Sequence, residues 1–175
     1  MSHFKPTPDF LRYSEAIAVL YNANIFAFKG ASAVLRFRAL LPATNWNRLR
    51  RINMSTVFLV PREVSRGIFG SHHSVPPENY DAWERACSTV GTLTGLHLVT
   101  VDMTIWNYHD YKSANTIPPD DLISILDPLK RITARVFDVE INTALPEAVN
   151  VSLGPLPFNI KQRHRPYKAD IFRQG

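Results

Sequence analysis

Several features are scarce in this 175-residue sequence, and each absence excludes a class of protein. Cys87 is the only cysteine, so a disulfide within the chain is impossible, which favours a reducing compartment. No run of about 18 apolar residues occurs, so we expect no membrane-spanning helix. The first ten residues are polar, contain two prolines and lack the apolar core of a secretory signal. We therefore expect an intracellular protein, cytoplasmic or nuclear.

The short motifs of catalysis and cofactor binding are also missing. The sequence has no Cys-x-x-Cys or His-x-x-x-His spacing, no Gly-x-Ser-x-Gly elbow and no dinucleotide fingerprint. Cys87 falls on the apolar stripe of an expected helix, where a cysteine behaves as a small inert hydrophobe. We interpret His97, at the start of an expected strand, as a half-buried structural residue. We expect a non-enzymatic protein without a metal or another cofactor.

The sequence does contain a repeated unit of amphipathic helix, short connector and apolar strand. Residues 1–10 are expected to be a flexible lead-in, residues 11–160 a single α/β domain, and residues 161–175 a basic tail. Two long polar segments, 61–77 and 106–119, are interpreted as loops. The periodicity predicts helices at 9–21, 31–41, 78–90 and from 120, with strands at 25–28, 52–60, 96–105, 136–141 and 149–153.

Polar and apolar residues alternate along the expected strands. In the segment 136–142, Phe137 and Val139 alternate with Asp138 and Glu140. Strands separated by helices pair in parallel through right-handed crossovers, and a parallel strand buried on both faces is a continuous apolar run. Alternation therefore indicates that the helices cover only one face of the sheet. We expect an α/β fold of helix–strand repeats, with a curved, mostly parallel sheet and helices on one face, as in leucine-rich-repeat-like solenoids.

The segment YSEAIAVLYNANIFAF resembles a motif of a large fungal family of unknown function. The motif has the form Tyr-x-Glu-Ala, Leu-Tyr, then Asn-x-Phe-x-Phe. The family's members are often found beside F-box-like segments, which implies a role in substrate recognition for ubiquitin ligation. We expect the motif to be structural, with Leu20, Phe26 and Phe28 burying the turn from helix to strand. The matching residues are Tyr13, Glu15, Ala16, Leu20, Tyr21, Asn24, Phe26 and Phe28.

The polar positions of the expected strands and the aromatic residues of the second loop make up a candidate protein-binding surface. Aromatic side chains contribute a disproportionate share of interface energy, so three of them are the expected anchors. We therefore predict a protein-interaction module without catalytic activity. The predicted partner-binding residues are Asn53, Ser55, Thr100, Asp102, Thr104, Trp106, Tyr108, Tyr111, Asp138, Glu140 and Asn142.

Three carboxylates of this set, Asp102, Asp138 and Glu140, support a second hypothesis. If their strands are neighbours, these groups lie close enough to form a catalytic or cation-binding cluster. No nucleophile or phosphate loop accompanies them in the sequence. The ordinary interpretation, a solvated strand face, is therefore favoured.

The net charge of +5 supports a third hypothesis, because it is concentrated at the end of the chain. The last fifteen residues hold five basic side chains against one carboxylate, and arginines also precede the expected strand 52–60. Such a distribution suits phosphates or an acidic partner, although no nucleic-acid-binding signature is present. The alternative function is nucleic-acid or acidic-partner binding through Arg48, Arg50, Arg51, Lys161, Arg163, Arg165 and Lys168.

Overall fold

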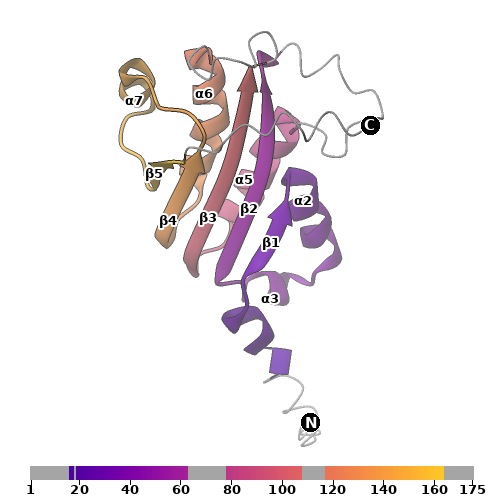
Figure 1. Cartoon of the computed structure of the whole chain (residues 1–175). Coiled ribbons are helices and arrows are strands. Elements are labelled where there is room, and N and C mark those ends of the chain that lie inside the picture. Colours follow the sequence, from indigo (N-terminus) through magenta and orange to yellow (C-terminus); the bar gives the residue numbers. More distant parts are fainter. Residues whose placement is uncertain (1–15, 18, 63–77, 108–116, 164–175) are drawn as a thin grey trace, which may run out of the picture.

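Five parallel strands form one sheet in the order β1-β2-β3-β4-β5 (Figure 1). The computed structural model describes residues 16–17, 19–62, 78–107 and 117–163. The strands are β1 (Phe26–Lys29), β2 (Arg51–Val60), β3 (Leu96–Asn107), β4 (Ala134–Ile141) and β5 (Asn159–Gln162). The helices are α2 (Ala31–Leu40), α3 (Ala43–Trp46), α5 (Tyr80–Gly91), α6 (Pro119–Leu126) with the 3-10 turn η1 (Asp127–Arg131), and α7 (Glu147–Leu153). The predicted α/β class with a parallel sheet is confirmed.

The crossover helices lie together on one face of the sheet. Each new strand is added beside the previous one in the same direction, so right-handed crossovers all fall on the same side. Figure 1 shows α2, α5 and α6 behind the sheet, with the near face of the central strands visible. Among the described elements, no helix covers that near face of β2 and β3. None of the described helices is long and apolar enough to cross a membrane.

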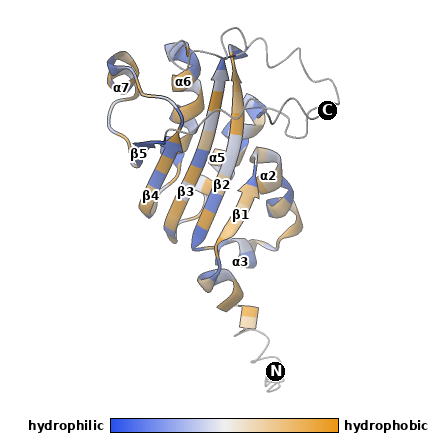
Figure 2. Cartoon of the chain, viewed as in Figure 1, coloured by the Kyte–Doolittle hydropathy of each residue, from blue (hydrophilic) through white to orange (hydrophobic). Residues whose placement is uncertain are grey.

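The core lies between the sheet and this helix layer. Along β2, the side chains of Ile52, Met54, Thr56 and Phe58 are buried, and the residues that alternate with them are half-exposed. Figure 2 shows the same alternation of hydrophobic and hydrophilic residues along the strands. The predicted one-sided burial therefore holds for β2, and β3 and β4 repeat it.

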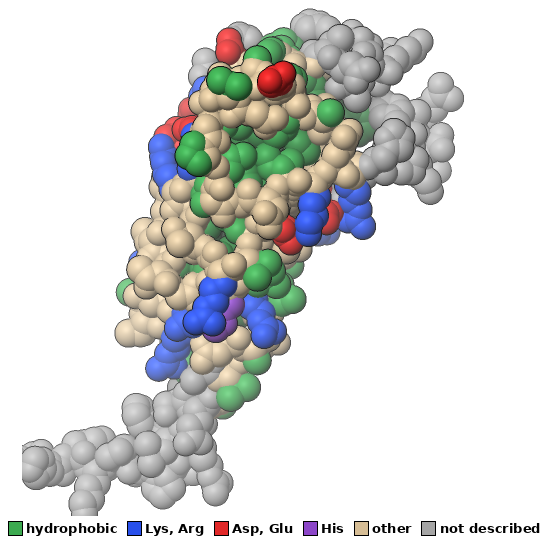
Figure 3. Space-filling model, turned by 90° about the vertical axis from the view of Figure 1, so that its left-hand side faces the viewer, with side chains coloured by type: hydrophobic (Ala, Val, Ile, Leu, Met, Phe, Trp, Pro, Cys, Tyr) green, Lys and Arg blue, Asp and Glu red, His purple; other side chains and the backbone are tan. Residues whose placement is uncertain are grey.

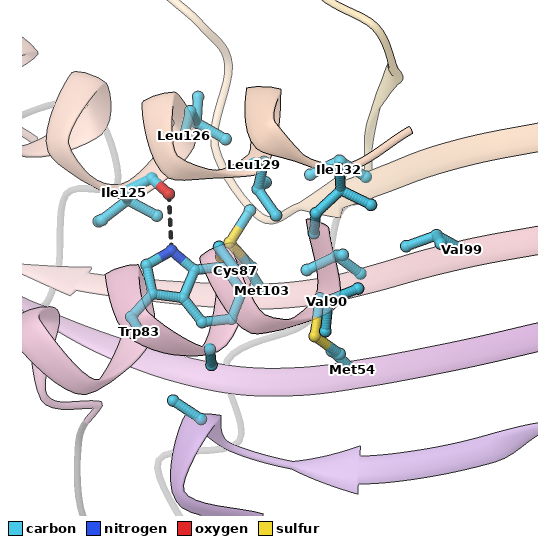
Figure 4. Close-up of a cluster of buried hydrophobic side chains, with 14 of the residues drawn as sticks. Met54, Trp83, Cys87, Val90, Val99, Met103, Ile125, Leu126, Leu129 and Ile132 are labelled. Carbon is cyan, nitrogen blue, oxygen red and sulfur yellow. Dashed lines mark hydrogen bonds between the residues drawn. The ribbon is translucent and has the colours of Figure 1, made fainter. Parts of the chain in front are cut away.

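Trp83 of α5 anchors the middle of the core. Its indole Nε1 donates a hydrogen bond of 2.9 Å to the backbone oxygen of Ile125, which joins α5 to α6 (Figure 4). Its ring packs edge-on against Phe58 at 5.4 Å between centroids. Cys87, one turn later on the same stripe, is fully buried, as the sequence predicted. Burial raises the pKa of the Cys87 thiol far above its ordinary value.

The helix boundaries follow local sequence signals. Asn79 caps α5, because its side-chain oxygen accepts a hydrogen bond of 2.9 Å from the backbone N–H of Ala82. Pro119 begins α6, where a missing N–H costs nothing. Pro128 falls where α6 changes to a 3-10 turn, as expected for a residue that shortens the helix.

The predicted strand at 149–153 is wrong, since these residues belong to helix α7. The valines and leucine of this segment alternate, but Val149 and Leu153 are also spaced by four residues and both are buried. Val151, between them, is 74% exposed. Gly154, with a φ of 63°, ends the helix. The short strand β5 follows and was not expected, because the prolines around it suggested irregular structure.

Three residues of the motif in segment 13–28 pack as predicted at the turn from helix to strand, and one does not. Tyr21 stacks on Phe26 with centroids 5.5 Å apart, and Phe37 of α2 contacts Phe26 and Phe28. Leu20 is 50% exposed, so the prediction that it buries the turn is wrong, and Tyr21 fills that place. Tyr13 and Glu15 lie outside the described residues.

Candidate functional site

We define the open face as the side chains of β2 to β5 that point away from the helix layer. Alternation along the strands places most of the predicted partner-binding residues there, and they are half-exposed. Register adds two residues of β5 and two apolar residues of β2. The open face consists of Asn53, Ser55, Val57, Leu59, Thr100, Asp102, Thr104, Trp106, Asp138, Glu140, Asn159 and Lys161.

The register arranges these residues in rows across the sheet. One row runs Asn53, Thr100, Asp138, Asn159 over four neighbouring strands. Asn53 Nδ2 donates a hydrogen bond of 2.9 Å to Thr100 Oγ1. Asn159 Nδ2 donates one of 3.3 Å to Asp138 Oδ1. Cross-strand pairs of this kind fix side-chain orientation, so the row presents an ordered polar surface.

The next row runs Lys29, Ser55, Asp102, Glu140, Lys161. Lys161 lies level with Glu140 but reaches diagonally to Asp138, with Nζ 2.8 Å from Oδ2. The hydrogen bond from Lys161, aided by the one from Asn159, lowers the pKa of the Asp138 carboxyl below its usual range.

The three carboxylates of the second hypothesis do come together. Asp102 and Glu140 are register partners, and Asp138 lies on the same face two residues before Glu140. Cationic side chains lie against this group, because Lys161 pairs with Asp138 and Arg163 NH1 lies 2.7 Å from Glu140 Oε2. In the described part of the chain, no group of three His, Cys, Asp or Glu residues is arranged to hold a metal ion. The ion pairs favour a surface of satisfied polar groups over a set of catalytic acids.

The open face becomes apolar toward the carboxyl ends of the strands. Leu59 and Trp106 are register partners there, one row beyond Val57 and Thr104, and all four are half-exposed. The other predicted aromatic anchors, Tyr108 and Tyr111, lie outside the described residues.

Asn142 has a different role from its neighbours. Its Oδ1 accepts a hydrogen bond of 2.8 Å from the Ile105 N–H, and its Nδ2 donates one of 3.0 Å to the Ile105 oxygen. The side-chain amide thus takes the place of a backbone peptide and extends the pairing of β3 with β4. Its polar atoms are engaged within the sheet, so its contribution to this face is structural.

The predicted basic set divides into two groups. Arg48, Arg50 and Arg51 lie at or just before the start of β2, whereas Lys161 lies on β5 beside Glu140. Arg51 is level with Val136, four residues before Glu140 and three strands from Lys161, which separates them by roughly 20 Å. Arg165 and Lys168 lie outside the described residues. The two described groups therefore do not form one site.

His97 lies beside the first of these groups and is exposed, so its interpretation as half-buried is wrong. The reason is its place as the second residue of β3, at the edge of the sheet. There the backbone N–H of His97 donates a hydrogen bond of 2.8 Å to the Arg50 oxygen, and the side chain is exposed. Its position next to two arginines could have been found only from the strand register.

The comparison with protein families matched residues 11–152 to a domain of unknown function, DUF7730. The chain belongs to the DUF7730 family. Residues 11–152 of this DUF7730 protein contain strands β1 to β4 and all but the last residue of helix α7, whereas β5 and its two open-face residues follow the matched range. Searches of curated proteins and of solved structures found no match.

Proposed function

We propose that this DUF7730 protein is a non-enzymatic interaction module that binds a protein partner on the open face. The observation that carries the proposal is a parallel sheet whose crossover helices lie on one side, with none of the described helices over the other face of β2 and β3. Parallel sheets are usually covered on both faces, so a half-exposed face of ordered polar groups is suited to a partner's surface. The rows joined by Asn53–Thr100 and Asn159–Asp138 supply preorganised donors and acceptors.

The partner we infer is a folded protein surface rather than an apolar peptide. The centre of the face carries hydroxyl, amide and carboxylate groups, and apolar contact is available toward the two ends of the strands, at Leu59 and Trp106 and at Leu98 and Val136. Non-obligate interfaces are, taken as a whole, about as polar as the rest of a protein surface and carry about ten hydrogen bonds, and aromatic residues are enriched in them. In this proposal the face works as the inner face of a leucine-rich-repeat-like solenoid does.

The resemblance to the F-box-associated fungal family suggests the setting of this interaction. We propose that the partner is a substrate selected for ubiquitin ligation in the cytoplasm or nucleus of a fungal cell. This part of the proposal rests on analogy, and fold alone does not determine function.

The test places an obstruction on the open face without disturbing the core. Ser55 and Thr104 are half-exposed, and neither side chain is needed for a row hydrogen bond, so Ser55→Arg and Thr104→Arg are expected to fold normally. Ser152→Arg, on the exposed side of α7, adds the same charge away from the face. The three variants and the wild-type chain are used as bait in a lysate of cells that express the protein.

The expected result is a discrete partner captured by the wild type and by Ser152→Arg, with recovery reduced about tenfold or more by each open-face variant. Nuclease treatment before capture should leave the recovery unchanged. If the two open-face variants recover the partner as well as Ser152→Arg does, the assignment of this face is wrong.

A further inference from the structure

A second surface lies at the amino ends of the central strands, and we call it the amino edge. It consists of the basic side chains Arg48, Arg50, Arg51, His97 and Arg135. The pairing of Arg51 with Leu98, and of Leu98 with Val136, puts β2, β3 and β4 at the same level here. Arg135 directly precedes Val136, so it is level with His97, whose backbone N–H bonds to the Arg50 oxygen on the other side. Alternation along β2 turns Arg51 toward the face that carries Asn53, so the basic side chains surround the strand ends from both faces of the sheet. Figure 3 shows basic side chains gathered around a histidine in the lower part of that view.

The amino-edge arginines have no carboxylate partner, in contrast to several basic residues elsewhere in the described part of the chain. Arg62, Arg131, Lys161 and Arg163 each form an ion pair with a carboxylate. Among the described residues, no carboxylate lies within ion-pair distance of Arg48, Arg50, Arg51 or Arg135. The amino edge is therefore a local excess of at least four positive charges. Such a field attracts anions, and the attraction is not offset by a neighbouring acid.

Arg50 is held in place for this role. Its NH1 donates hydrogen bonds to the backbone oxygens of Asn47 at 2.8 Å and Leu49 at 2.9 Å. The guanidinium also lies over Gly95, where an added Cβ would be 2.9 Å from NH1. Fixing a guanidinium in advance reduces the side-chain entropy that is lost when an anion binds. Arg51 has a longer backbone contact, since its NH1 donates a hydrogen bond of 3.4 Å to the Ala23 oxygen.

The strongest cations here are all arginines, and this points to a particular anion. A guanidinium offers a planar fork of donors that matches phosphate oxygens two at a time, which the point charge of lysine cannot do. We propose that the amino edge binds a phosphate group on a phosphorylated segment of a partner protein. This site adjoins the amino end of the open face, with Arg51 two residues before Asn53, and its ligand goes beyond the interaction proposed for that face.

The size of the amino edge favours a phosphopeptide over nucleic acid. The site spans three neighbouring strands, or about 10 Å, which suits one or two phosphate groups. Single-stranded nucleic acids bind over about 4 to 16 nucleotides and stack their bases on exposed aromatic rings. The tryptophan of α3 next to this edge, Trp46, is 1% exposed and is packed in the core. An Arg cluster without an aromatic platform is the arrangement used to recognise phosphorylated motifs.

The experiment measures binding by fluorescence anisotropy with four labelled probes. The first is a nine-residue Gly/Ser peptide with two phosphoserines. The second is the same peptide without phosphate, and the third carries glutamate in place of each phosphoserine. The fourth is a twelve-nucleotide oligouridylate. The full chain is compared with the double variant Arg48→Gln/Arg51→Gln and with Lys161→Gln/Arg163→Gln, which removes the same charge from the β5 side of the sheet.

We expect the phosphopeptide to bind the full chain most tightly of the four probes. Arg48→Gln/Arg51→Gln should weaken this binding about tenfold or more, because two charge-assisted contacts are lost. Lys161→Gln/Arg163→Gln should change it by less than about twofold, since its cations are already paired with carboxylates. Thermal unfolding of both double variants checks that each remains folded.

Four results would overturn the inference. The phosphopeptide could fail to bind, or could bind no more tightly than the same peptide without phosphate. Equal binding of the glutamate peptide would mean that general acidity, and not phosphate, is recognised. Equal or tighter binding of oligouridylate would assign the edge to nucleic acid. Equal weakening of phosphopeptide binding by the two double variants would mean that the net charge of the protein, and not the amino edge, determines the affinity.

Discussion

Glu78 and Ala31 are 47 residues apart in the chain, yet the backbone N–H of Ala31 donates a hydrogen bond of 2.7 Å to Glu78 Oε2. Ala31 is the first residue of α2, and the preceding Gly30 has no side chain to cap that helix. The same oxygen accepts a hydrogen bond of 2.8 Å from Thr56 Oγ1 on β2. The buried carboxylate of Glu78 thus caps α2 from outside the helix and joins it to the sheet.

We predict that Glu78→Ala lowers the free energy of unfolding by about 1.5–3 kcal/mol, because a buried N–H and a hydroxyl lose a charged acceptor. Glu78→Gln keeps an oxygen at this place and should cost less than the alanine variant. Urea unfolding monitored by circular dichroism measures both. Glu84→Ala is the control, since the exposed Glu84–Arg131 pair contributes about 0–1 kcal/mol. Equal losses for Glu78→Ala and Glu84→Ala would contradict the capping role.

A matched pair of glycines in the α5–β3 connection gives a second prediction. A Cβ at Gly91 would lie 2.5 Å from the backbone oxygen of Arg131, which cannot move without shifting η1. A Cβ at Gly95 would meet only the end of the Arg50 side chain, at 2.9 Å from NH1, which can shift without moving the backbone by loosening its hydrogen bonds to Asn47 and Leu49. Gly91→Ala should therefore lower the free energy of unfolding by about 1–3 kcal/mol, the range for overpacking, while Gly95→Ala should cost less. Urea unfolding of the two variants side by side decides this, and similar stabilities would refute it.

Much of this fold was predictable because the order of polar and apolar residues along a strand indicates which of its faces is buried. The alternation of Phe137 and Val139 with Asp138 and Glu140 correctly indicated one buried and one uncovered face. The same reasoning failed for α7, where an alternating apolar pattern also contains the i, i+4 spacing of a helix. Short apolar segments satisfy both periods, and packing against α6 decided between them.

The pairing of side chains across strands was not predictable in the same way. The sequence placed Asp138 on an uncovered face, but its contacts with Asn159 and Lys161 depend on the register of β5, a strand that was not expected. Glu78 was likewise assigned to the start of a helix, and nothing in its neighbourhood along the chain indicated that it caps α2. Relationships between distant segments require the register of the sheet, which local patterns do not encode.

The single cysteine gives a third prediction. Cys87 is fully buried, and burial raises the pKa of its thiol, so little reactive thiolate exists in the folded protein. A colourless aromatic disulfide reagent should modify the native chain about 100-fold or more slowly than the urea-unfolded chain, because reaction waits for transient opening. Ser55→Cys introduces a second thiol on the open face, and that thiol should react rapidly in the native protein. Slow reaction of both thiols would indicate that the open face is covered in solution.

The Lys161–Asp138 pair gives the last prediction, which concerns pH. The hydrogen bonds from Lys161 and Asn159 lower the pKa of Asp138 in the folded state relative to about 3.9 in the unfolded chain. A lowered carboxyl pKa stabilises the fold at pH values above the unfolded pKa, and this contribution disappears as the pH falls through the folded pKa. Lys161→Gln should raise the pKa of Asp138 toward its ordinary value, with the remaining depression due to Asn159.

Carbon-detected NMR titration of the Asp138 carboxyl measures this shift directly. Arg85→Gln is the matched control, because Arg85 is an exposed residue of α5 on the helix side of the sheet and its removal changes the net charge equally. The stability difference between wild type and Lys161→Gln should be present near neutral pH and absent below the folded pKa. If Asp138 titrates identically in wild type and Lys161→Gln, the ion pair does not form in solution, and β5 would then present Lys161 to a partner instead of to Asp138.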